Sequence, residues 1–344
     1  MTQYVGLDVS LKMTALCVVD HDGALLAEGK VASEPEALAD WLGAHAPEAC
    51  RIGLETGPLS VWLWNELKGR GLPVHVIDAR HAKAGLVLQA SKTDRNDARG
   101  LAQIMRTGWF KEVRVKSRAA HLLRALLASR GMLVATRRDL ENQIRGLLKT
   151  FGLVLGIARR GRFEVRLRDL LTAEPGLSRL IAPLLEARRA IIEQIEHYDR
   201  QLLTIARHHQ AVPRLMTVPG VGPVTAIAFV AAIDDPTRFR RSRQVGAYLG
   251  LAPRRYQSGE VDRPGHISKA GDGLTRTLLF EAANALLTRS RKPCALKAWA
   301  EAIAARCGRK KAKVALARRL AALLHRLWCD QATFRADSVQ TAAA

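Results

Sequence analysis

Two short apolar runs each end in a carboxylate, and this feature limits how the chain can fold. Residues 4–7 lead into Asp8, and residues 51–54 lead into Glu55. An acid at the end of a buried strand is costly unless a partner compensates its charge. We therefore expect the two strands to deliver Asp8 and Glu55 to a common site.

A second acidic pair lies in the stretch Ser91-Lys92-Thr93-Asp94-Arg95-Asn96-Asp97. Asp94 and Asp97 are three residues apart and share one face of a helix. Thr93 is suited to cap that helix, and acids in a first turn favour the helix dipole, so capping alone also explains the pattern. Together with Asp8 and Glu55, however, the pair supplies hard oxygen ligands for two Mg²⁺ ions, or for Mn²⁺ in their place. We interpret the four acids as one metal site.

The charge balance points to an anionic partner. The chain has 344 residues, with 54 Lys and Arg against 32 Asp and Glu, a formal net charge of +22. Nucleic acid is the usual partner of such an excess, and a membrane surface is the competitor. No apolar run approaches the roughly 18 residues that a spanning helix needs, and no signal peptide is evident. The five cysteines show no CxxC spacing and are typical of reduced intracellular thiols.

The order of predicted elements indicates an α/β domain over residues 1–108. Three strands come first, and helices then alternate with strands. The strands are predicted at residues 4–8, 14–20, 24–31, 51–56 and 73–78, and the helices at 35–44, 59–70, 82–89 and 93–106. This is the order of an RNase-H-like fold, in which acids on the first strand, the fourth strand and a late helix bind metal.

A basic helical region is predicted for residues 109–210. Residues 106–170 carry 16 Lys and Arg against 5 Asp and Glu, and residues 122–149 and 177–209 repeat apolar side chains every three to four positions. Two long helices of this kind favour an antiparallel coiled-coil arm or a dimerising one. An ordinary helical linker domain is the alternative. Residues 289–326, with 12 Lys and Arg against one Glu, are predicted to be helical and to lie along nucleic acid or to form a solvated basic face.

Residues 211–330 are predicted to form a mostly helical domain, followed by a flexible tail at 331–344. Residues 215–226 have a helix-hairpin-helix pattern in which Gly220 and Gly222 let the backbone approach a phosphate, although a plain helical turn has the same pattern. Arg254 and Arg255 precede Ser258 in an expected loop, where they can clamp a phosphate. A second polar turn contains Lys269.

Together these motifs resemble the transposases of the insertion sequence 110 and 1111 family, which also includes the Piv-type DNA invertases. The resemblance covers nearly the whole chain, and its segments are Gly6-Leu7-Asp8, Leu54-Glu55-Thr56-Gly57, Lys92-Thr93-Asp94-Arg95-Asn96-Asp97, Val218-Pro219-Gly220-Val221-Gly222 and Arg254-Arg255-Tyr256-Gln257-Ser258-Gly259. It implies a RuvC-like domain whose four acids bind Mg²⁺. It also implies a serine nucleophile, which aligns with Ser258, and a structured RNA from the element that pairs with donor and target DNA.

The implied function is a cytoplasmic prokaryotic recombinase, associated with the nucleoid when active, that cuts and rejoins DNA through a covalent phosphoserine. It would act as a homo-oligomer, either a dimer or a tetramer. Two other functions remain open. A RuvC-like nuclease of the junction-resolvase type would hydrolyse DNA without a covalent intermediate, and a non-catalytic nucleic-acid-binding protein would use only the basic surfaces.

Overall fold

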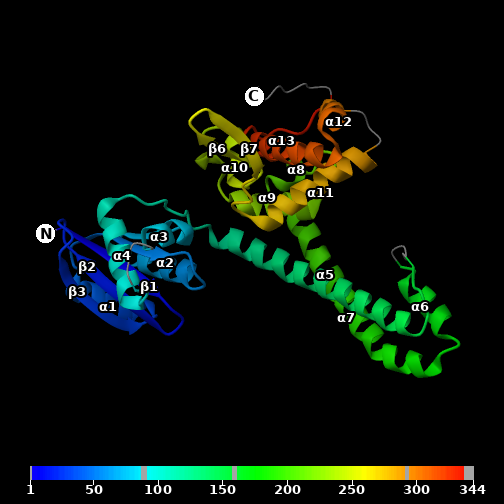
Figure 1. Cartoon of the computed structure of the whole chain (residues 1–344), viewed down its shortest axis with the longest axis horizontal. Coiled ribbons are helices and arrows are strands. Elements are labelled where there is room, and N and C mark those ends of the chain that lie inside the picture. Colours follow the sequence, from blue (N-terminus) through cyan, green and yellow to red (C-terminus); the bar gives the residue numbers. More distant parts are fainter. Residues whose placement is uncertain (1, 87–90, 157–160, 291–293, 337–344) are drawn as a thin grey trace. The chain divides into compact units, whose positions relative to one another are not determined.

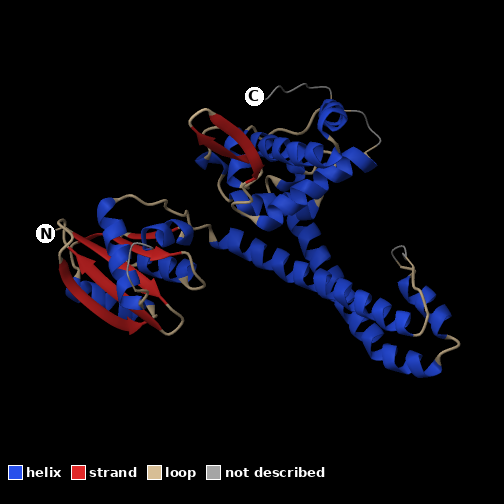
Figure 2. Cartoon of the chain, in the orientation of Figure 1, coloured by secondary structure: helices blue, strands red, loops and turns tan. Residues whose placement is uncertain are grey.

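The chain folds into two compact units, Met1–Lys116 and Ser117–Ala344. The computed structural model describes residues 2–86, 91–156, 161–290 and 294–336 (Figure 1). Strands form a sheet in the first unit and a single hairpin in the second, and the rest of the regular structure is helical (Figure 2). Within the described ranges, every helix is too short or too polar to cross a membrane.

The first unit is built on a five-stranded mixed sheet with the order β3-β2-β1-β4-β5. The strands are β1 (Gln3–Val9), β2 (Met13–Val19), β3 (Leu25–Ala32), β4 (Ala49–Glu55) and β5 (Val74–Ile77). The first three pair antiparallel, whereas β4 is parallel to β1 and β5 is parallel to β4. All five predicted strands are confirmed, with ends that differ by a residue or two.

Helices cover both faces of this sheet. On one face, α1 (Pro35–His45) and α2 (Ser60–Gly69) bury Leu38 and Leu63 against Val5 and Leu7 of β1. On the other face lies α4 (Asp94–Thr107), which follows α3 (Ala79–Leu86). The end of the helix predicted at 82–89 falls outside the described residues. The side chains of β1 therefore alternate between two cores, as a strand buried on both faces requires.

The second unit begins with two long helices, α5 (Arg118–Thr150) and α7 (Pro175–His208). Arg130 of α5 contacts Asp199 of α7 at 2.6 Å, and Glu141 of α5 contacts Arg188 of α7 at 2.9 Å. Residue numbers rise along one helix as they fall along the other, so the pair is antiparallel. The helix α6 (Phe163–Leu171) packs at the far end of the pair (Figure 1), between the two predicted apolar repeats.

The other end of the helix pair is anchored in a large core. Leu127 of α5 and Leu202 of α7 belong to the same apolar cluster as α9 (Pro223–Ile233), whose residues from Thr225 onward are all buried. The surrounding elements are α8 (Val212–Leu215), the short 3-10 helix at Pro236–Arg238, α10 (Arg243–Tyr248), α11 (Gly273–Arg289), α12 (Ala295–Cys307) and α13 (Arg309–Cys329).

The loop predicted around Ser258 is wrong. Residues Pro253–Ser258 form β6 and Val261–Ile267 form β7, which pair antiparallel. Every residue of β6 is exposed, so its sequence shows no alternation between apolar and polar side chains. The pattern that usually identifies a strand is therefore missing.

Candidate metal centre and candidate nucleophile

Asp8 and Glu55 lie at the same edge of the sheet and face helix α4. A Cβ added to Gly6 of β1 would lie under 3.0 Å from the Ala98 carbonyl oxygen of α4, and one added to Gly53 of β4 would lie as close to the Met105 side chain of the same helix. Because strand side chains alternate between faces, residues two positions further along point to the same side. Those residues are Asp8 and Glu55, on neighbouring parallel strands.

Helix α4 brings the other two acids to this edge. Thr93 caps it, as predicted, by accepting a hydrogen bond from the Asn96 amide at 3.2 Å. Asp94 and Asp97 occupy the first turn, with Asp94 exposed and Asp97 half-buried. The small residues at Gly6 and Gly53 allow the helix to lie close to the sheet, which sets the height of both acids above the strand ends.

The four carboxylates interact electrostatically. Burial, followed by the charges of Asp97 and Asp94, raises the pKa of Asp8 above its ordinary value. Burial also raises the pKa of Glu55, and the charges of Asp8 and Asp97 add to this effect. Neighbouring negative charges therefore add to the effect of burial at Asp8 and Glu55, and a divalent cation would relieve this repulsion.

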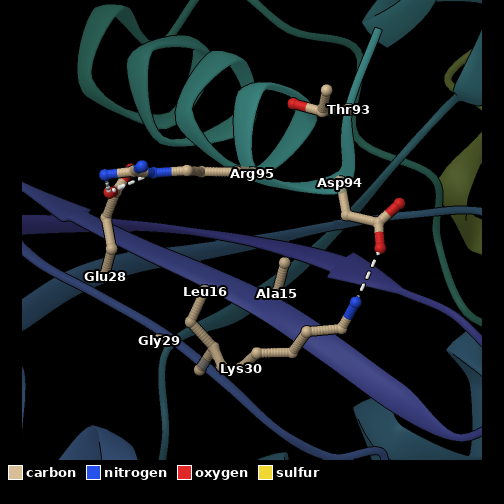
Figure 3. A pocket seen from close by; sticks show the side chains of 8 residues that line it. All are labelled: Ala15, Leu16, Glu28, Gly29, Lys30, Thr93, Asp94 and Arg95. Carbon is tan, nitrogen blue, oxygen red and sulfur yellow. Dashed lines mark hydrogen bonds and ion pairs between the residues drawn. The ribbon is translucent and has the colours of Figure 1, made fainter.

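A set of ion pairs ties the start of α4 to strand β3 (Figure 3). The Lys30 ammonium donates to the Asp94 carboxylate at 2.9 Å, and this contact lowers the pKa of Asp94. Next to it, Arg95 donates to Glu28 at 2.6 Å, and Arg99 contacts the same carboxylate. The pKa of Glu28 is lowered chiefly by its hydrogen bond from Arg99. We did not predict these contacts, because they join positions more than sixty residues apart and no sequence pattern marks them.

Two separate hollows adjoin the four acids. Asp8 and Glu55 line a pocket of about 320 Å³ together with Ser10, Thr56 and Ser60. Asp94 lines a separate hollow of about 630 Å³ with Lys30 and its neighbours. No three of the four acids, all of which the structure describes, bring ligand oxygens within 4.8 Å of one another. The structure therefore does not gather three of these acids into one coordination sphere, although carboxylates are the ligands that Mg²⁺ prefers.

A tighter acidic group occurs elsewhere in the described residues. Asp20, His21 and Asp22 bring their ligand atoms within 4.8 Å of one another in the turn between β2 and β3. Asp20 accepts hydrogen bonds from the amides of Asp22 and Ala24, each at 2.9 Å. Its carboxylate therefore already has partners, and the turn accounts for the group.

Ser258 ends strand β6 at the tip of the exposed hairpin. It pairs with Val261 across a two-residue turn, Gly259-Glu260. Gly259 has a φ of +55°, and glycine in the first position of a two-residue turn is typical of the type II′ hairpin. The side chain of Ser258 is exposed to solvent. Ser258 belongs to the second unit, whereas the four acids belong to the first.

The two predicted phosphate-clamping arginines lie on opposite faces of the hairpin. Arg254 and Arg255 are consecutive in β6, and successive strand side chains point to opposite sides. Arg255 forms a two-pronged ion pair with Asp262 of β7, with its Nε donating at 2.8 Å. Arg254 donates to the Ser268 carbonyl at 3.3 Å. The structure therefore does not bring the two guanidinium groups together around one phosphate.

The remaining predicted nucleic-acid contacts have different surroundings. Lys269 is exposed and holds a φ of +54°, a strained value for a residue with a side chain. Gly220 packs on α11, because a Cβ there would overlap the Ala282 carbonyl. Gly222 precedes α9, and a Cβ at this position would meet no heavy atom of the described residues within 4 Å, so this approach to the helix is open. Of the two glycines, packing therefore explains Gly220 but not Gly222.

Two family models match the chain. The model of a transposase family carrying the four-acid DEDD signature matches residues 5–152, and the model described as the transposase IS116/IS110/IS902 family matches residues 212–300. Together they span both units. The first includes all four acids, and the second includes Ser258 and Lys269.

Several relatives agree with this match. The transposase for insertion sequence element IS1111A of Coxiella burnetii is 32% identical over 340 residues, which cover 96% of this chain and 91% of the relative. A probable family 20 transposase of Pseudomonas aeruginosa is 31% identical, covering 96% of this chain and 98% of the relative. The pilin gene-inverting protein of Moraxella bovis is 35% identical over 92 residues, covering 26% of this chain and 28% of the relative. The chain therefore belongs to the IS110/IS1111 family of transposases, enzymes of DNA transposition.

Proposed function

We propose that this transposase cuts and rejoins DNA with two catalytic parts: a Mg²⁺ centre on Asp8, Glu55, Asp94 and Asp97, and Ser258 as the nucleophile. The observation that carries the proposal is that Asp8 and Glu55 end neighbouring strands beneath α4, whose first turn carries Asp94 and Asp97. The pKa values of Asp8 and Glu55 are raised, which supports cation binding, because a bound cation would stabilise both ionised carboxylates.

In the proposed reaction, the Ser258 hydroxyl oxygen attacks a DNA phosphorus and forms a phosphoserine bond. The bond from phosphorus to the outgoing DNA oxygen breaks, that oxygen takes up a proton, and the serine proton leaves to water or a neighbouring base. Bound Mg²⁺ supplies charge stabilisation for the transferring phosphoryl group. The phosphoserine conserves the energy of the broken bond, so the reverse attack by another DNA end rejoins strands without ATP.

The same proposal gives each part of the chain a role. Residues 1–108 act as an RNase-H-like, RuvC-like metal domain, which the strand order β3-β2-β1-β4-β5 supports. Residues 109–210 act as a coiled-coil arm, and residues 211–330 act as the serine domain. Within that domain, the helix-hairpin-helix segment with Gly220 and Gly222 contacts DNA backbone phosphates. The open approach at Gly222 supports this use of the segment.

We also propose that the protein binds an RNA encoded by the element in addition to donor and target DNA. The net charge of +22 supports a nucleic-acid surface larger than one duplex requires. The proposed active form is a cytoplasmic homo-oligomer, a dimer or a tetramer. Steep weakening of binding between 50 and 200 mM salt is expected if this surface contacts phosphates, with a slope of about 0.9 per contact on duplex DNA.

The decisive experiment compares Ser258→Ala with Ser268→Ala in the full-length protein. The substrate is a plasmid carrying the DNA that flanks the coding sequence, incubated with Mg²⁺ and the RNA transcribed from that DNA. Ser258→Ala should lose both recombinant product and a denaturant-resistant protein–DNA adduct. Ser268 lies in the turn after β7, and the proposal gives it no contact with DNA. It is therefore the control, and Ser268→Ala should keep the adduct.

The alternative is a metal nuclease of the junction-resolvase type, in which the four acids direct water to the phosphate. It predicts that Ser258→Ala still cuts DNA and leaves hydrolysed ends. An adduct that survives in Ser258→Ala, or that peptide mapping assigns to another residue, would refute the role of Ser258.

A further inference from the structure

The β6–β7 hairpin has two chemically different faces. Across the two strands, Ser258 pairs with Val261, Gln257 with Asp262, and Tyr256 with Arg263. Because paired residues lie on the same side of a hairpin, Arg263 shares its face with Tyr256, and alternation along β6 adds Ser258 to that face.

Contacts on each side confirm this assignment of faces. A Cβ added to Gly265 of β7 would lie 2.7 Å from the ring carbon Cε2 of Tyr256. The Tyr256 ring therefore packs over β7 on the face that carries Ser258. On the opposite side, Arg255 and Asp262 form their two-pronged ion pair. The charge of Arg255 is therefore already compensated and faces away from Ser258.

Arg263, unlike Arg255, lies on the face that carries Ser258 and has no compensating partner among the described residues. It is exposed, and within the part of the chain that the structure describes its guanidinium forms no hydrogen bond or ion pair. Its position is diagonal to Ser258 across the hairpin, and diagonal neighbours lie about 7–8 Å apart, within reach of a long side chain. Arg254 is on the same face but four residues along the strand from Ser258, about 13 Å at the usual rise of a strand.

We propose that Arg263 binds the phosphate that Ser258 attacks and is the principal cation of this face, with Arg254 as a more distant contributor. The inference rests on the proposed role of Ser258. The Arg263 guanidinium would donate to the non-bridging oxygens of the DNA phosphate and neutralise the charge that builds up during attack. The planar fork of arginine suits this contact, whereas lysine provides only a point charge.

The test uses the full-length protein, the flanking-DNA plasmid and the element RNA, with the rate of adduct formation as the readout. Arg263→Gln should slow the reaction by about 10²–10³-fold, the usual loss for one stabilising donor. Arg255→Gln should lose less than tenfold, because Asp262 already holds that arginine. Arg179→Gln, an exposed arginine of α7, removes the same charge elsewhere and should match the wild type.

A second measurement separates phosphate contact from a structural effect. The scissile phosphate, mapped from the wild-type adduct, is replaced by a neutral methylphosphonate in a synthetic duplex. The methylphosphonate has no negative charge for Arg263 to bind, so the substrate change and the Arg263→Gln substitution remove the same interaction. On this substrate the rate of adduct formation by Arg263→Gln should therefore lie within about threefold of the wild-type rate. Arg263→Lys should be intermediate on the natural phosphate. An unchanged urea midpoint for each variant checks that the hairpin still folds.

The outcomes distinguish two failures. If Ser258→Ala still forms the adduct, the proposed nucleophile is wrong and the inference falls with it. If Ser258→Ala loses the adduct but Arg263→Gln behaves like Arg179→Gln or no worse than Arg255→Gln, the inference alone is refuted. A full defect of Arg263→Gln on the methylphosphonate would also refute it.

Discussion

Replacing Gly6 by alanine tests how far the metal centre depends on the close approach of β1 and α4. The added Cβ would fall under 3.0 Å from backbone atoms of Ala98 and Ala102, and backbone atoms cannot rotate out of the way. To restore an ordinary contact in a close-packed interior, the helix must move outward by about 1 Å. Overpacking of this kind costs about 1–3 kcal/mol of unfolding free energy, which a urea titration measures.

The same movement should damage the site. Asp94 and Asp97 lie in the first turn of α4, so an outward shift carries both away from Asp8 and Glu55. A misplacement of about 1 Å costs about 10²-fold in rate. Plasmid recombination in Mg²⁺ should therefore fall about a hundredfold in Gly6→Ala, and Mn²⁺ binding measured by calorimetry should weaken.

Gly43→Ala is the matched control. Gly43 lies in helix α1 of the same unit, and a Cβ there would meet nothing within 4 Å among the described residues. Alanine is the better helix former by about 1 kcal/mol, so this variant should be slightly more stable and fully active. The reasoning fails if Gly6→Ala keeps the wild-type urea midpoint. It also fails if stability drops while recombination and Mn²⁺ binding are unchanged.

Three further predictions concern charged groups. Asp8→Asn should abolish recombination yet raise the urea midpoint of the metal-free protein at pH 7, because the raised pKa of Asp8 means that its ionised form destabilises the fold. Lys30→Met removes a cation that competes at Asp94, so Mn²⁺ should bind about two- to fivefold more tightly by calorimetry. Arg124→Met leaves the largely buried Asp272 without its cation and should cost about 1–3 kcal/mol at pH 7. The pKa of Asp272 is lowered in the folded state, so this deficit in urea titrations should disappear as the pH falls below 3.8 and the carboxylate protonates.

The first unit was predictable because its sequence carries local signals at every step. Its strands alternate between two buried faces, Thr93 caps α4, and Asp8 and Glu55 stand directly after apolar residues. These signals predict that Asp8 and Glu55 end at one edge of a sheet, whereas the grouping of Asp94 and Asp97 with them relied on the order of elements in an RNase-H-like fold. What the sequence does not reveal is Lys30, since its partner Asp94 is 64 residues away and lysine in a strand has no distinctive pattern.

The β6–β7 hairpin was missed for the opposite reason. Its side chains are exposed on both faces, so neither strand shows an apolar alternation, and Pro264 within β7 argues against a strand. Backbone pairing holds the hairpin together, and backbone pairing leaves no trace in composition. The pairing of Arg255 with Asp262 depends on the register. For that reason the sequence grouped Arg255 with Arg254, whereas the structure separates them.

The long helix pair has a mechanical consequence. α5 has 33 residues, and at 1.5 Å per residue it is about 50 Å long. One end is fixed in the C-terminal core through Leu127 and Leu202, and the other end has a core of its own around Ile144 and Phe163. Two ion pairs join the helices between these ends, Arg130 with Asp199 and Glu141 with Arg188, so the helix pair links the two cores mechanically. A load on the distal end would reach the C-terminal core over a span equal to about fifteen base pairs of duplex.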